Sequence, residues 1–95
     1  MSAYMIALVK VTDPDQFKQY AAAAGPATAK YGGTYLARGG ETSLFEGEMP
    51  AERLVVVEFA DRAAAETWYN SPEYQAAKKL REGAATGTFM CVDGA

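Results

Sequence analysis

The sequence predicts an α+β fold with the element order βαββαβ, in which helices cover one face of a four-stranded antiparallel sheet. Two observations lead to this prediction. Apolar runs of strand length alternate with longer stretches in which apolar residues recur at helical spacing. Capping residues, glycines and prolines stand at the junctions between these stretches, where the chain has to turn. With 95 residues, the chain is expected to form a single domain over residues 1–95.

The first strand is expected over residues 4–11, which are apolar at both parities, as in a central strand. A helix then follows, because Asp13 is a good N-cap and Pro14 suits the first helical position. An apolar stripe marks one side of this helix over residues 17–24. The Gly-Pro pair at residues 25–26 is expected to interrupt the helix and to restart it with a bend.

The remaining elements follow from the same signals. Asp61 and Ser71 are expected to cap two successive helices, and Pro72 suits the first position of the second. The expected elements are a strand over residues 34–38, an excursion over 39–50 with a short strand segment at 44–46, a strand over 53–59, helices over 62–69 and 72–82, and a last strand over 88–92.

Composition excludes several classes of function. A net charge of −3 with scattered Lys and Arg argues against nucleic-acid binding. The apolar run at residues 5–9 is too short for a signal peptide or a membrane span, so a cytoplasmic protein is expected. Histidine is absent, which excludes a Ser-His-Asp triad, a Cys/His zinc site and a histidine-ligated haem. No metal and no built-in cofactor are therefore expected, and Cys91 is interpreted as a small core residue.

The strands also predict a partner. Residues 5–9 and 54–59 are apolar at both parities, whereas the helices can cover only one face of the sheet. The second face must meet another apolar surface, and the simplest cover is a second copy of the chain. A homodimer that packs sheet against sheet is therefore expected.

Several segments resemble those of a known family: YGGTYLARGG at residues 31–40, LFEG at 44–47, LVVVEF at 54–59 and WYNSPEY at 68–74, followed by Arg81. From about Tyr4 to its end, the chain resembles domain-of-unknown-function family 1330. This resemblance implies a dimeric α+β barrel, in which two ferredoxin-like protomers pack their sheets together and each keeps a small cavity between sheet and helices. The wider superfamily includes antibiotic-biosynthesis monooxygenases, muconolactone isomerases and haem-dependent chlorite dismutases. The histidine of the haem-binding relatives has no counterpart here, and the family itself implies no agreed activity.

One ionisable residue, Glu58, lies in a strand that is otherwise apolar on both sides. A carboxylate removed from water is costly unless it is paired or hydrogen-bonded, and Arg38 and Arg53 are the nearest strand-associated candidates. Arg38 and Glu58 meet only if the register of their strands places both on one face. The sequence leaves this register open, because a loop of unknown conformation joins the two strands.

If both residues face the cavity, and Arg81 reaches down from the last helix, two cations would surround one carboxylate. Such a pocket suits a small organic acid or an enolate. The candidate catalytic residues are then Glu58 as a base, with Arg38 and Arg81 stabilising negative charge. Four further residues are candidates for ligand binding: Tyr35, Arg53, Trp68 and Tyr74.

The expected function is the binding or conversion of a small organic acid or carbonyl compound, without a built-in cofactor, in a pocket between sheet and helices. The alternative is a non-catalytic ligand-binding or structural homodimeric module. In the structural case the charged residues form an ion-pair network that fixes the register, and the aromatic residues belong to the core or the interface.

Overall fold

The computed structural model describes residues 2–95 and confirms the predicted fold class. Its elements are β1 (Ala3–Val11), α1 (Pro14–Lys30), β2 (Thr34–Arg38), β3 (Arg53–Phe59), α2 (Arg62–Tyr69), α3 (Pro72–Leu80) and β4 (Ala85–Asp93). The four strands form one sheet in the order β2-β3-β1-β4, and every neighbouring pair is antiparallel. This is the ferredoxin-like arrangement, with β1 and β3 at the centre of the sheet.

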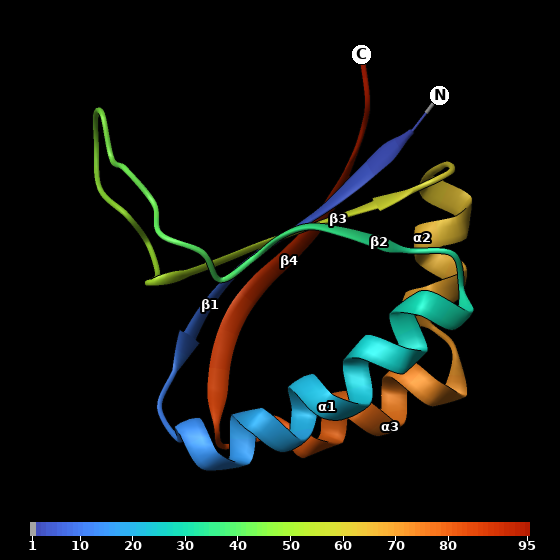
Figure 1. Cartoon of the computed structure of the whole chain (residues 1–95), viewed down its shortest axis with the longest axis horizontal. Helices are drawn as coiled ribbons and strands as arrows, with labels where there is room; N and C mark the ends of the chain where they lie inside the picture. Colours follow the sequence, from blue (N-terminus) through green and yellow to red (C-terminus); the bar gives the residue numbers. More distant parts are fainter. Residues whose placement is uncertain (1) are drawn as a thin grey trace.

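The helices lie together on one side of the sheet, and the long connection between β2 and β3 projects away from them (Figure 1). Along β1 the residues Ala3, Met5, Ala7 and Val9 are buried, while the residues between them are less buried. The alternation shows that the odd positions of β1 face the helices. The core therefore lies between the helices and one face of the sheet.

Helix α1 begins where the sequence predicts, since the Asp13 side chain accepts a hydrogen bond of 3.2 Å from the backbone N–H of Gln16. The predicted interruption at Gly25-Pro26 is wrong, because α1 continues through Pro26 to Lys30. Proline removes only one helical hydrogen bond. Packing compensates for that loss, because α1 has buried residues on both sides of Pro26: Ala24, Ala27 and Thr28.

The two later helices are capped as predicted. The Asp61 side chain accepts a 2.7 Å hydrogen bond from the N–H of Ala64, and the Ser71 hydroxyl accepts one of 3.1 Å from the N–H of Tyr74. Helix α3 ends at Leu80 instead of near residue 82. Strand β4 is longer than predicted, because it pairs with β1 along its whole length.

The short strand expected at residues 44–46 does not form. The connection over residues 39–52 contains four glutamates and no helix or strand, and the side chain of Phe45 within it is 92% exposed. No described strand lies beside residues 44–46 to supply hydrogen-bond partners, so the local apolar pair is not sufficient to make a strand.

The face of the sheet opposite the helices, called the open face below, carries apolar residues without cover in the protomer. It is formed by the residues that alternate with the core positions: Tyr4, Ile6, Leu8, Leu54, Val56, Met90 and Val92. Met90 and Val92 are each about half exposed. Among residues 2–95, no helix is long and apolar enough to cross a membrane.

Candidate functional site

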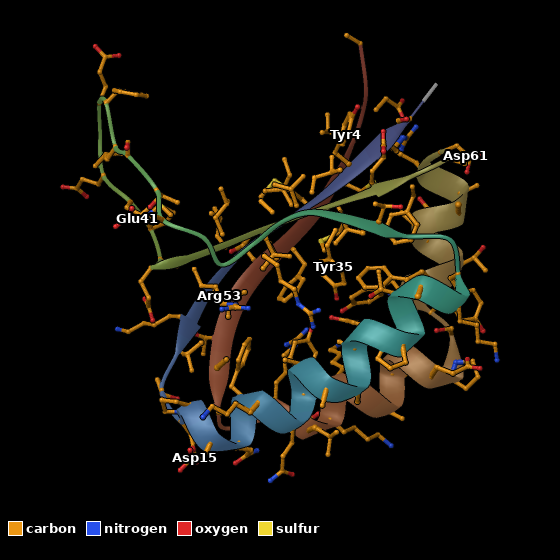
Figure 2. The ribbon with its side chains drawn as sticks, viewed as in Figure 1. Tyr4, Asp15, Tyr35, Glu41, Arg53 and Asp61 are labelled. Carbon is orange, nitrogen blue, oxygen red and sulfur yellow. The ribbon has the colours of Figure 1, made fainter. Side chains whose placement is uncertain are left out.

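A cavity lies between α1 and the helix-facing side of the sheet, and we call it the arginine cavity. Its floor comes from β1, where the small side chain of Ala7 lies between those of Met5 and Val9. The free space inside is about 30 Å³. The walls are mainly apolar and aromatic, with polar groups supplied by Tyr20, Tyr35, Arg38 and Arg53. Figure 2 shows Tyr35 and Arg53 on the helix side of the sheet and Tyr4 on the other side.

Arg38 reaches the cavity because of an irregularity in β2. The register between β2 and β3 shifts between Tyr35 and Ala37, so that Arg38 pairs with Val55, a residue that also lines the cavity. The guanidinium donates a 3.0 Å hydrogen bond to the carbonyl oxygen of Ala21 in α1, and its Cζ lies 4.2 Å from the centre of the Tyr35 ring. The bulge thus gives Arg38 the same orientation as Tyr35 and joins β2 to α1.

Arg53 enters the cavity from the first position of β3, opposite Val9. Its Cζ lies 5.3 Å from the centre of the Phe17 ring, and its Nε is buried without a hydrogen-bond partner. Gly39 adopts a φ of +73°, and a Cβ at that position would lie 2.3 Å from the nearest guanidinium nitrogen of Arg53. The positive φ favours glycine at this position, and a larger residue would also displace the end of the Arg53 side chain.

Arg81 follows α3 and packs against the wall of the same cavity. Its Cζ lies 4.4 Å from the ring centre of Phe89 and 5.4 Å from that of Tyr20, and both rings line the cavity. Like Arg53, it has a buried Nε without a hydrogen-bond partner. The hydroxyls of Tyr20 and Tyr74 lie 2.8 Å apart, and burial raises the pKa of Tyr20. The Tyr20 hydroxyl therefore keeps its proton and can donate it to a hydrogen bond.

A buried hydroxyl fixes the far wall of the cavity. Thr28 is fully buried in α1, and its Oγ1 accepts a 3.1 Å hydrogen bond from Nε1 of Trp68. The same Oγ1 donates to the carbonyl oxygen of Ala24 at 2.8 Å and lies 3.2 Å from the Tyr35 hydroxyl. Thr28 thus links Tyr35 and Trp68, the two aromatic residues of this wall, to helix α1.

The charged side chains that line the arginine cavity are all cations. None of the residues that line it is an aspartate or a glutamate. Between residues 2 and 95, the ion pairs are Lys30 with Glu73 and Arg62 with Asp93, and each involves side chains with substantial exposure. The arginines at the cavity therefore have no carboxylate partner in the described chain. Arg53 and Arg81 are partly buried, whereas Arg38 is exposed. A partly buried cation without a counter-ion favours binding of an anion.

The structure brings together most of the residues singled out from the sequence. Arg38, Arg53, Tyr35 and Trp68 line the cavity, and Arg81 contacts its wall. Tyr74 does not line it. This residue is fully buried behind Tyr20 and packs against Trp68 in a tilted arrangement, with ring centres 4.2 Å apart.

Glu58 does not lie at the arginine cavity. It pairs with Tyr4 on β1 and with Thr34 on β2, between the core residues Val57 and Phe59, so its side chain belongs to the open face. The conditional arrangement of two arginines around this carboxylate is therefore not formed. In a regular register Arg38 would have paired with Leu54 and shared the face of Glu58, but the bulge reverses the side to which Arg38 points. No residue among 2–95 forms an ion pair with Glu58.

Two residues at the arginine cavity, Tyr20 and Thr28, are not singled out from the sequence as site residues. Tyr20 was placed only in an apolar stripe, where an aromatic residue gives no separate signal. Thr28 was missed because the helix was expected to break at Pro26. In an uninterrupted helix Thr28 continues the stripe of Phe17 and Ala24, and a polar residue on a buried stripe would have marked the site.

The family follows from comparison with known sequences. Residues 2–95 match the model of DUF1330, a domain of unknown function. The chain belongs to the DUF1330 family. This confirms the resemblance seen in the sequence. No curated protein matches the chain.

Solved structures share the fold of this DUF1330 protein at low sequence identity. The protein RPA0582 of unknown function from Rhodopseudomonas palustris is 20% identical, with a TM-score of 0.74 over 99% of this chain and 82% of its own. A dimeric ferredoxin-like protein of unknown function from Thermobifida fusca is 22% identical, with a TM-score of 0.64 over 97% and 92%. SnoaB, a cofactor-independent oxygenase from Streptomyces nogalater, is 13% identical, with a TM-score of 0.68 over 99% and 93%.

Proposed function

We propose that this DUF1330 protein binds a small organic acid as its anion in the arginine cavity. The observation that carries the proposal is that Arg38 and Arg53 line one cavity that no carboxylate lines. Arg81 adds positive charge from outside the lining, where its guanidinium packs against the rings of Tyr20 and Phe89. Of the two lining arginines, Arg53 has a buried Nε without a partner. A bound carboxylate would supply the missing acceptor, and arginine is suited to this because its planar donors match a carboxylate.

The same groups define what chemistry the cavity can support. Guanidinium groups and the protonated hydroxyl of Tyr20 stabilise a negative oxygen, such as that of a carboxylate, a phenolate or an enolate. The lining offers no carboxylate to act as a base, so any proton abstraction depends on the ligand or on water. SnoaB, a cofactor-independent oxygenase, is precedent for reaction without a cofactor in this fold. A base at Glu58 would serve only a molecule bound at the open face.

Thermal unfolding in the presence of organic acids tests the binding proposal. A ligand that binds the native state raises the melting temperature, and isothermal titration then gives its affinity. We expect carboxylates to stabilise the wild type, and we expect Arg38→Met to weaken that effect. Lys18→Met, which removes an exposed cation from α1, is the control for net charge. Binding that is equal in both variants, or no binding by any acid, would contradict the proposal.

We also propose that the protein is a homodimer joined through the open face. Three features support this: the apolar residues of that face, the half-exposed side chains of Met90 and Val92, and structural neighbours that are dimeric. Light scattering at micromolar concentration should give twice the mass of the chain. Met90→Glu should dissociate the dimer, because it places a carboxylate in an apolar interface. A well-folded wild-type monomer would refute this assembly.

A further inference from the structure

A second cavity adjoins the first on the other side of a thin aromatic wall. It is a groove between α2 and β4 with a free volume of about 320 Å³, which we call the α2–β4 groove. Its inner surface includes Ala65 from α2 and Cys91 from β4. Three residues line both this groove and the arginine cavity: Met5, Trp68 and Phe89. These three side chains therefore form the partition between the two spaces.

One side chain of the partition is held by a hydrogen bond, and the other two, Met5 and Phe89, are held by packing alone. Trp68 is 2% exposed and is held by the hydrogen bond from Nε1 to Thr28. Met5 is unbranched and adapts its shape readily, whereas Phe89 is half-buried on β4, an edge strand with a neighbour on one side only. Rotation of Met5 and Phe89 would join the two spaces. It would break no hydrogen bond of the described chain, but it would shift the buried Met5 side chain and the contact of Phe89 with the Arg81 guanidinium.

The sizes of the two spaces are complementary. About 30 Å³ accommodates two water molecules or a single acid group. The groove, at about 320 Å³, is within the range of small-molecule sites. Arg62, Glu66 and Asn70 stand along the groove, but its deeper residues are apolar or aromatic. One space thus suits a charged head group, and the adjoining one suits an apolar body.

We infer that the ligand is an amphipathic carboxylic acid, whose carboxylate binds the arginines while its alkyl or aryl tail lies in the α2–β4 groove. This inference rests on the proposed function and adds the class of acid to it. The path between the two ends crosses the small side chain of Ala7. Arg53 pairs opposite Val9 and Cys91 opposite Met5, so the ends are separated by about 13 Å along the strands and about 10 Å across them. Together these give roughly 16 Å between the two backbone positions. The long side chain of Arg53 spans part of this distance, and only an acid with a long tail, such as decanoate, spans the rest.

Binding of straight-chain acids from acetate to decanoate tests the inference. Each methylene that enters an apolar groove should increase affinity about fourfold, until the groove is full. Cys91→Phe, which places a ring in the groove, should weaken this dependence on chain length, with acetate as the reference ligand because it has no tail to enter the groove. Thr67→Phe adds the same bulk on an exposed position of α2 and should behave as the wild type.

A second measurement needs no variant. Cys91 is the only cysteine of the chain, so its alkylation by iodoacetamide reports on the groove directly. Burial raises the pKa of the Cys91 thiol, and the reaction is therefore followed at alkaline pH. Saturating decanoate should slow the alkylation at least tenfold, whereas saturating acetate should not change it.

The outcomes separate the two proposals. Dependence on chain length together with protection of Cys91 supports the groove as the tail site. Acids that bind with the same affinity at every chain length, or decanoate that binds without protecting Cys91, overturn this inference and leave the anion site intact. Failure of every acid to bind overturns both.

Discussion

Replacing Arg53 by methionine distinguishes a residue kept for function from one kept for stability. Its Nε is buried without a partner, which costs about 1–3 kcal/mol. The contact of its guanidinium with Phe17 recovers about 0.5–2 kcal/mol. Methionine keeps an apolar stem over Phe17 and removes the unpaired polar group. We therefore expect Arg53→Met to leave the free energy of unfolding within about 1 kcal/mol of the wild type, or to raise it.

The affinity for an anion, in contrast, should fall when Arg53 is replaced by methionine. A hydrogen bond to a charged group contributes about 1.5–3 kcal/mol, so the affinity for a carboxylate should fall roughly 10- to 150-fold. Urea denaturation measures the free energy of unfolding, and isothermal titration measures the affinity for the carboxylate. Arg53→Lys, which retains the charge, should bind more tightly than Arg53→Met. A loss of stability greater than about 2 kcal/mol with unchanged affinity would show that Arg53 is structural and would refute the reasoning.

Three further substitutions have definite expected results. Thr28→Val removes the acceptor of the Trp68 Nε1 proton and should lower the free energy of unfolding, measured by urea denaturation, by about 1–3 kcal/mol. Thr28→Ser keeps the hydroxyl and should retain most of the wild-type stability. Ser71→Ala should cost about 1 kcal/mol through loss of the helix cap, with ligand affinity unchanged in titrations because Ser71 does not line the cavity. The hydrogen bond from Lys30 is the main cause that lowers the pKa of Glu73 from 4.5 to about 2. The stability that Glu73 contributes should be complete above pH 4.5 and be lost as the pH falls towards 2, and Glu73→Gln should remove that part of the pH dependence of unfolding.

The sequence predicted those features that depend on local signals. The order of the strands and helices and the caps at Asp13, Asp61 and Ser71 follow from spacing and residue type, and all are observed. The continuity of α1 through Pro26 was not predictable in this way, because burial on both sides of the proline outweighs its local preference. The grouping of three arginines at one cavity depends on the register of β2, which is set by pairing with β3 and carries no local signal.

The shift between Tyr35 and Ala37 also bears on how the family can vary. Leu36 has no partner in the ladder and is half exposed, so the strand holds one residue more than its pairing needs. Deletion of Leu36 would leave Ala37 opposite Val56 and Arg38 opposite Val55. A chain with a β2 one residue shorter could thus keep Arg38 at the cavity, because the extra residue is not part of the pairing that positions the cation.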